Sequence, residues 1–240
     1  MRDKNNLHLQ FRELKQMPVM FPKEWSNDFK CNNNFLQDIY GSPMSSVGGS
    51  FLCNNNFLKS LQYGPKQIRK NFDCSFNNLN SLEYGPIFVG GEYRCTNNQL
   101  ETLLGMPKKL NGSFIASFNS LLDLQYSCED VGGDYFVNDN KLLSIIGAPK
   151  NVGGSFNVSN NNLTNLKGCP TIICGDFFLH DNPDLNETES FPNYLGSNIF
   201  ARNTKLTKQT ILNLIEKNNT HFKGKIYIWT KTILDYNLIL

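Results

Sequence analysis

The chain has 240 residues, a formal net charge of +2 and 18% charged residues. A charge this close to zero argues against a strongly basic nucleic-acid binder and against an acidic solvating tail. No apolar run approaches the length needed to span a bilayer, and the polar residues 1–6 lack the apolar core of a signal peptide. We therefore expect a cytoplasmic protein with no membrane contact.

The sequence repeats itself with a period of about 21 residues. An aromatic residue marks each of eight copies: Phe29, Phe51, Phe72, Tyr93, Phe114, Tyr135, Phe156 and Phe177. A small apolar residue follows two positions later, and a leucine follows seven positions later in most copies. Five positions after the aromatic residue every copy has asparagine: Asn34, Asn56, Asn77, Asn98, Asn119, Asn140, Asn161 and Asn182. Self-similarity of this kind is typical of a solenoid in which each copy forms one coil.

Each copy contains the pattern of a short strand followed by turns. The aromatic and small apolar residues alternate with period two, which predicts a strand that points both side chains into a core. Two further leucine or isoleucine residues point inward, a Gly-Pro or Gly-x-Pro turn follows, and valine or isoleucine re-enters the core. Strands of successive copies should pair in parallel, about 4.8 Å apart. An asparagine amide both donates and accepts, so the asparagines should satisfy backbone groups of their own coil and the next.

The segment Phe51-x-Cys53-x-x-Asn56-x-Leu58 resembles the L-x-L-x-x-N-x-L segment of leucine-rich repeats. The resemblance covers roughly residues 7–206 and implies a mainly β, right-handed solenoid of about ten coils, with a parallel sheet on its concave face. It departs in one place, because Val89 lies four residues before Tyr93 where the family usually has an apolar residue three before the strand. The motif Val-Gly-Gly-Ser-Phe-x-Cys-x-x-Asn-x-Leu is similar to a short repeat variant of bacteriophage proteins.

The chain is expected to form one structural domain with capped ends. Residues 1–28 read as an N-terminal capping repeat, 29–206 as the repeat solenoid and 207–240 as a C-terminal cap. In the cap, Thr207 is predicted to begin a helix, 226–229 is predicted to be a strand, and 233–234 and 238–240 add apolar cover. The apolar face of the helix would be Ile211, Leu212, Leu214 and Ile215. The alternative is that 207–240 is a dimerisation or partner-binding module.

The sequence contains no recognisable pattern of catalytic residues. Cys31, Cys53, Cys74 and Cys95 share one repeat position, which predicts an inward ladder of packing residues rather than a disulfide or metal site. The three histidines lack metal-ligand spacing, the glycine pairs recur before strands without a P-loop lysine, and no nucleophile elbow is present. We expect no enzyme, metal or cofactor; the alternative is an enzymatic site within 207–240. Many free thiols favour a reducing cytoplasm.

The outward side chains of the strands form the candidate binding surface. They are Leu52, Asp73, Arg94, Ile115, Phe136 and Phe178 in the first outward column, with His180 from the second. Apolar residues on a face that should be solvated are typical anchors of a protein interface. In the alternative, Phe136 and Phe178 bend over to cover their neighbours. Phe76 and Phe118, beside the asparagine column, are expected to pack between coils.

These observations predict a non-catalytic protein-binding scaffold. The viral resemblance implies a phage-encoded protein that binds a host bacterial protein in the host cytoplasm and inhibits a defence system. The alternative is a glycan- or surface-receptor-recognition module of a virion or exported protein. Nucleic-acid binding is not expected, because Lys30 and Arg94 are isolated cations on the outward column.

Overall fold

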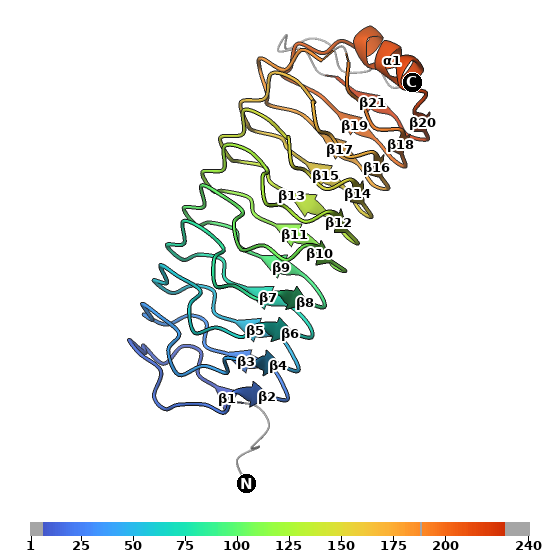
Figure 1. Ribbon diagram of the computed structural model, residues 1–240. Helices are drawn as coiled ribbons and strands as arrows, with labels where there is room; N and C mark the ends of the chain where they lie inside the picture. The colour runs from blue at the N-terminus through green and yellow to red at the C-terminus, as the bar shows by residue number, and fades with distance from the viewer. Residues whose placement is uncertain (1–6, 188, 229–240) are drawn as a thin grey trace.

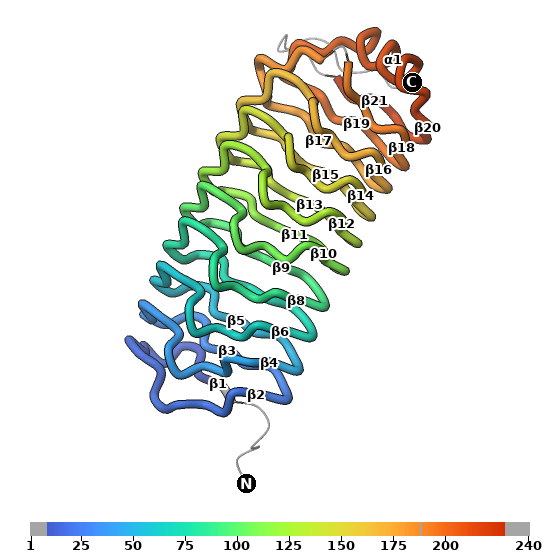
Figure 2. The backbone as a smooth tube through the Cα atoms, viewed as in Figure 1, coloured from blue at the N-terminus to red at the C-terminus, as the bar shows by residue number. Residues whose placement is uncertain are grey.

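The computed structural model describes residues 7–187 and 189–228 as one stack of coils (Figure 1). Each coil of about 21 residues contributes two short strands, one to each of two rows along the stack. The colours in Figure 2 pass from blue to red along the long axis, so neighbours in space are successive copies of the repeat. The predicted mainly β solenoid with parallel sheets is confirmed.

The first row is one eleven-stranded parallel sheet, made by the odd-numbered strands. Phe51 pairs with Phe72 and Phe114 pairs with Tyr135, so equivalent positions of successive copies lie directly over one another. The strands are β1 (Leu7–His8), β3 (Phe29–Lys30), β5 (Phe51–Leu52), β7 (Phe72–Asp73), β9 (Tyr93–Arg94), β11 (Phe114–Ile115), β13 (Tyr135–Phe136), β15 (Phe156–Asn157), β17 (Phe177–Phe178), β19 (Ile199–Phe200) and β21 (Ile226–Tyr227).

The second row, of even-numbered strands, was predicted only as a re-entry of valine or isoleucine into the core. In the structure this re-entry is itself a strand. In the strands from β4 to β18 the second residue is buried and the first is more exposed, as in Leu110 and Lys109. The row divides between β8 and β10 into two parallel sheets. The strands are β2 (Glu24–Trp25), β4 (Ser46–Val47), β6 (Gln67–Ile68) and β8 (Phe88–Val89), then β10 (Lys109–Leu110), β12 (Asp130–Val131), β14 (Asn151–Val152), β16 (Ile172–Ile173), β18 (Tyr194–Leu195) and β20 (His221–Phe222).

The core is a set of columns between the two rows. The aromatic residues that begin the odd-numbered strands are buried and pack ring against ring, with centroids 5.3 Å apart between Phe114 and Tyr135 and 5.7 Å between Tyr135 and Phe156. The inward leucine and isoleucine residues of each copy, such as Leu121 and Leu124, are buried beside them. Because one coil alone has only a few apolar side chains, burial is achieved by stacking.

The turns between the rows hold the coils close together. Gly105 has φ +99°, and a Cβ atom there would collide with the backbone carbonyl of Leu82 in the preceding coil. The equivalent position in another coil is Tyr126, also with positive φ (65°), and this side chain is exposed. Glycine is therefore required in the turn at Gly105, whereas the equivalent turn at Tyr126 accepts a side chain.

The C-terminal segment continues the solenoid. The helix α1 (Lys208–Lys217) begins after Thr207, whose side chain accepts from the Thr210 backbone N–H at 3.1 Å, as predicted for a capping residue. Ile211 and Leu214 are buried, whereas Leu212, predicted on the same face, is 41% exposed. The helix lies at the red end of the stack in Figure 1.

Both rows extend past the helix. The strands β20 and β21 pair with β18 and β19, so the segment up to 227 adds a coil in which a helix replaces a turn. The predicted strand at 226–229 is observed at Ile226–Tyr227; residue 229 and the apolar cover at 233–234 and 238–240 lie outside the described residues. Over residues 7–187 and 189–228, no helix is long and apolar enough to cross a membrane.

Candidate functional site

The asparagine column forms a continuous ladder of hydrogen bonds. Asn119 Nδ2 donates to the carbonyls of Ala116 (3.0 Å) and Ser117 (3.3 Å) in its own coil and to that of Cys95 (3.1 Å) in the coil before. Its Oδ1 accepts from the Leu100 backbone N–H of that preceding coil at 3.0 Å. The neighbouring coil is therefore the preceding one, not the next one as predicted, because the bend folds the amide back against the earlier copy.

All eight asparagines bond in this way, and seven of them are buried; Asn98 is half-buried. Aspartate could not donate to the carbonyls, and leucine could neither donate nor accept. The side-chain amides of these eight asparagines are thus already used in hydrogen bonds within the chain and are not available to a ligand.

The structure contains a second polar ladder, which was not predicted from the sequence. In most coils the side chain of the residue before the odd-numbered strand accepts a hydrogen bond from the equivalent backbone N–H of the next coil. Ser155 N donates to Asp134 Oδ1 (2.8 Å), and Asp176 N donates to Ser155 Oγ (3.1 Å). Asp28 accepts from Ser50 N at 2.8 Å, and this bond is the main cause that lowers the pKa of the Asp28 carboxyl. The available signal was that this position is polar in every one of the eight copies.

The cysteine ladder is buried, and the thiols are free. Burial raises the pKa of Cys31 to about 12 and raises those of Cys53, Cys74 and Cys95 well above the ordinary value. Thiols held protonated in an apolar core are packing groups and not nucleophiles. Among the described residues, no group of three histidine, cysteine or acidic side chains is arranged to hold a metal ion.

The predicted outward column is a straight line along the eleven-stranded sheet. Pairing between successive strands places these residues side by side, in the order Leu52, Asp73, Arg94, Ile115, Phe136, Asn157 and Phe178. Most are half-buried, and Arg94 is exposed and pairs with Glu92 at 2.7 Å. The sheet therefore brings the predicted binding residues together on one face.

An aromatic stack at the C-terminal end of this column was only partly predicted. The ring of Phe178 stacks on that of Phe200 (centroids 4.8 Å, 10° between planes), and Phe200 stacks on Tyr227 (4.8 Å, 6°). We call these three residues the aromatic stack. Phe200 and Tyr227 were missed because they lie beyond the eight clear copies; each follows the first residue of a strand, as Phe178 does. Phe178 does cover a neighbour, and all three rings remain half-buried.

A polar hollow of about 720 Å³ lies beside the aromatic stack. His180 Nδ1 is 2.8 Å from Asp181 Oδ2, and Arg202 Nη2 donates to the same oxygen at 3.2 Å. Burial acts to raise the pKa of Asp181, but hydrogen bonds from His180, Asn203 and Arg202 outweigh it, so the pKa is lowered. His180, predicted as a binding residue, thus lines this hollow together with Asn160.

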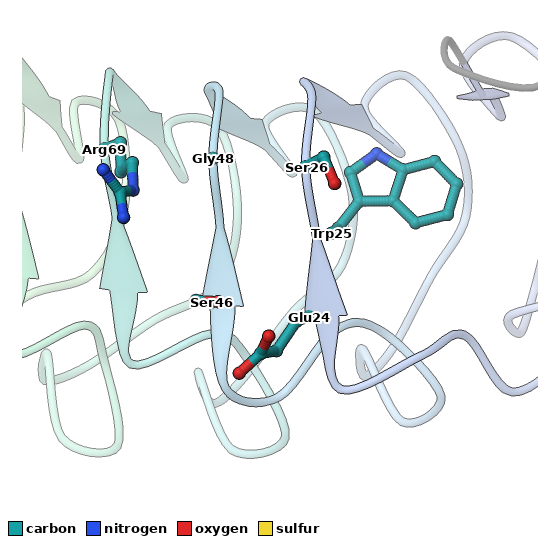
Figure 3. A pocket seen from close by; sticks show the side chains of 6 residues that line it. All are labelled: Glu24, Trp25, Ser26, Ser46, Gly48 and Arg69. Carbon is teal, nitrogen blue, oxygen red and sulfur yellow. The ribbon is translucent and has the colours of Figure 1, made fainter.

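A second hollow of about 370 Å³ lies over β2, β4 and β6 (Figure 3). Glu24 on β2 and Arg69 just after β6 come from separate coils, and their side chains do not converge on a common point. Trp25 faces away into its own packing, where its indole N–H donates to the Asp28 carbonyl at 3.1 Å. This hollow does not contain a constellation that could act on a bound molecule.

The prediction for Phe76 and Phe118 was wrong. Each is 52% exposed instead of packed between coils. Both have positive φ (54° and 57°), and this left-handed backbone at the bend turns the ring outward while the following asparagine turns inward.

No protein-family model matches the sequence, and no curated protein matches it at a significant level. Function is therefore inferred from the surfaces of the solenoid.

Proposed function

We propose that this chain is a non-catalytic scaffold that binds a partner protein through the outward face of the eleven-stranded sheet. The observation that carries the proposal is the aromatic stack of Phe178, Phe200 and Tyr227 at the end of a straight outward column. Large aromatic side chains in a fixed arrangement are the usual source of binding energy at protein interfaces. Because the sheet holds them in place, little conformational entropy is lost on binding.

The surroundings of the aromatic stack support the same proposal. His180, Asp181 and Arg202 form a hydrogen-bonded polar group next to it. Apolar anchors beside a polar rim are the usual composition of a protein–protein interface. The ion pair of Arg94 and Glu92 is a further polar contact on the same face.

The identity of the partner rests on the sequence motif. The segment Val47-Gly48-Gly49-Ser50-Phe51 and its equivalents resemble short leucine-rich repeats of bacteriophage proteins. On this basis we propose a phage-made protein that acts in the host cytoplasm, binds a host bacterial protein and inhibits a defence system.

The test begins with capture of a partner. The full chain is immobilised, exposed to a bacterial host lysate, and the retained protein is identified by mass spectrometry and purified. Its affinity is then measured for the wild type and for the double variant Phe178→Ser/Phe200→Ser. We expect the variant to bind at least about 100-fold more weakly, because two interface rings are lost.

The matched control is Phe88→Asn, which removes a 46% exposed ring from the other row of strands. Melting curves from circular dichroism show whether each variant is folded. Equal affinity of the wild type and the double variant for the captured protein would show that the partner does not bind at this face.

Glycan recognition is the second candidate, and the polar hollow favours it. Asn160, His180 and Asp181 line this hollow with planar polar groups, and the His180 ring lies 6.3 Å from that of Phe178. Sugars bind through hydroxyl groups to such side chains and through their apolar faces to aromatic rings. A glycan array probed with the wild type and with His180→Ala tests this candidate. If it is right, the wild type binds a defined glycan and His180→Ala does not.

A further inference from the structure

A row of exposed phenylalanines follows the bends after the odd-numbered strands. Its members lie four or six residues after the start of a strand and are 45 to 73% exposed. We call this row the Phe ridge: Phe11, Phe35, Phe57, Phe76 and Phe118. The rings of Phe35 and Phe57 stack with centroids 6.0 Å apart, and the Phe76 carbonyl accepts from the Asn56 backbone N–H at 3.2 Å. The ridge thus follows five of the first six odd-numbered strands, whereas the aromatic stack lies at the C-terminal end of the sheet.

Three members of the ridge hold a backbone conformation that disfavours phenylalanine. Phe11, Phe76 and Phe118 have φ of 56°, 54° and 57°. Other coils place asparagine or aspartate at this position, and these residues tolerate left-handed backbone better than a bulky side chain does. The equivalent residues are Asn33, Asn55, Asn97, Asp139, Asn160 and Asp181.

Packing within the chain does not compensate for this strain, since about half or more of each of the three rings faces water. Strain that the fold does not need is a sign of a functional position. The three phenylalanines are therefore better explained by a contact made outside the chain.

The size of the ridge fits a contact with another protein surface. A phenylalanine has about 200 Å² of surface, so five rings exposed by about half present about 500 Å². Two such ridges facing each other bury about 1,000 Å² from the rings alone, which reaches the area that a stable interface needs. A row made of one residue type can pair with itself when a two-fold axis reverses it, because phenylalanine then faces phenylalanine.

The charges at the two ends of the ridge are opposite. Near Phe11 lie Arg12, Glu13 and Lys15, with a net positive charge. Near Phe118 lie Glu101, Asp123, Asp139 and Lys141, with a net negative charge. An antiparallel arrangement of two chains brings the basic end of one ridge toward the acidic end of the other. We infer that the Phe ridge is the interface between two copies of this chain, packed antiparallel about a two-fold axis.

The experiment measures the mass of the full chain in solution by sedimentation between about 1 and 100 µM. We expect a concentration-dependent dimer for the wild type. The double variant Phe76→Asn/Phe118→Asn carries the residue that other coils use, so it should remain folded and should melt at a higher temperature at low concentration. Its dimer dissociation constant should rise at least about tenfold.

The matched control is again Phe88→Asn, because the equivalent position in a later coil is Asn151 and the ring lies on β8, away from the ridge. This variant should dimerise like the wild type. A wild type that is monomeric at about 100 µM, or a ridge variant that dimerises as tightly as the wild type, would overturn the inference. Partner capture by the aromatic stack is a separate measurement, so either proposal can fail without the other.

Discussion

Two neighbouring positions of the repeat differ in how much they vary. The inward position is asparagine in all eight copies, whereas the residue just before it is asparagine, aspartate or phenylalanine. The inward side chain must serve several buried backbone groups at once, which only one residue type does well. The outward position needs only to accept positive φ, so its identity can change with function. Invariance and variation in the repeat thus reflect backbone chemistry and surface use.

The largest effect should come from the inward position. Asn119→Leu removes four hydrogen bonds and leaves the Leu100 N–H and the Cys95 carbonyl without this partner. We expect a loss of about 4 kcal/mol in the free energy of unfolding, measured with urea. Asn162→Leu, at an exposed position where other copies have Phe35 and Phe57, should change it by less than about 0.5 kcal/mol. Similar losses of unfolding free energy in the two variants would contradict the difference proposed between the inward and the exposed position.

The turn glycine gives the next largest effect. Gly105→Ala places a Cβ atom against the Leu82 carbonyl on a left-handed backbone, and we expect a loss of about 2 to 3 kcal/mol. Tyr126→Ala, at the same repeat position, should have little effect, because this turn already holds a side chain at positive φ. Urea unfolding of both variants checks this, and an unchanged Gly105→Ala protein would show that the turn relaxes.

Substitution at the outward position should stabilise the protein instead of destabilising it. Phe118→Asn relieves the unfavourable backbone of a bulky residue, and we expect a gain of about 0.5 to 1 kcal/mol in low-concentration thermal melts. Phe57→Asn is the control, because its φ is not positive and it has no such strain to relieve. A destabilised Phe118→Asn protein would mean that the ring contributes to the fold.

The smallest effect concerns pH. The folded pKa of Asp181 is lowered, so its hydrogen bonds stabilise the fold above the unfolded pKa of about 3.9, and this contribution is lost as pH falls through the folded pKa. Because the side chain is partly exposed, we expect less than about 1 kcal/mol. The free energies of unfolding of the wild type and of Asp181→Asn should differ at pH 7 and become equal near pH 2. A constant difference would assign the effect to packing.

The sequence was sufficient for positions that repeat in identical form. The strand that begins at each aromatic residue, the inward cysteines and Thr207 as the helix cap all follow from spacing and residue type. The second row of strands did not, because two residues with one buried side chain have no period to recognise.

Contacts between coils were harder to predict than contacts within one coil. The direction of the asparagine bonds depends on how the bend tilts the amide, which residue order does not determine. The aromatic stack involves Phe200 and Tyr227 from irregular copies, and the exposure of Phe76 and Phe118 depends on a backbone angle. These features arise from three-dimensional stacking and have weak or no local signals.

The division of the second row has a mechanical consequence. Between β8 and β10 the even-numbered strands change from one sheet to another, while the odd-numbered strands form one sheet throughout. Because strand pairing continues there only in the odd-numbered row, we expect the solenoid to bend most easily at this point, which then acts as a joint. Such a joint would let the two halves of the molecule adjust their angle, so that surfaces on either side of it could fit partners of different curvature.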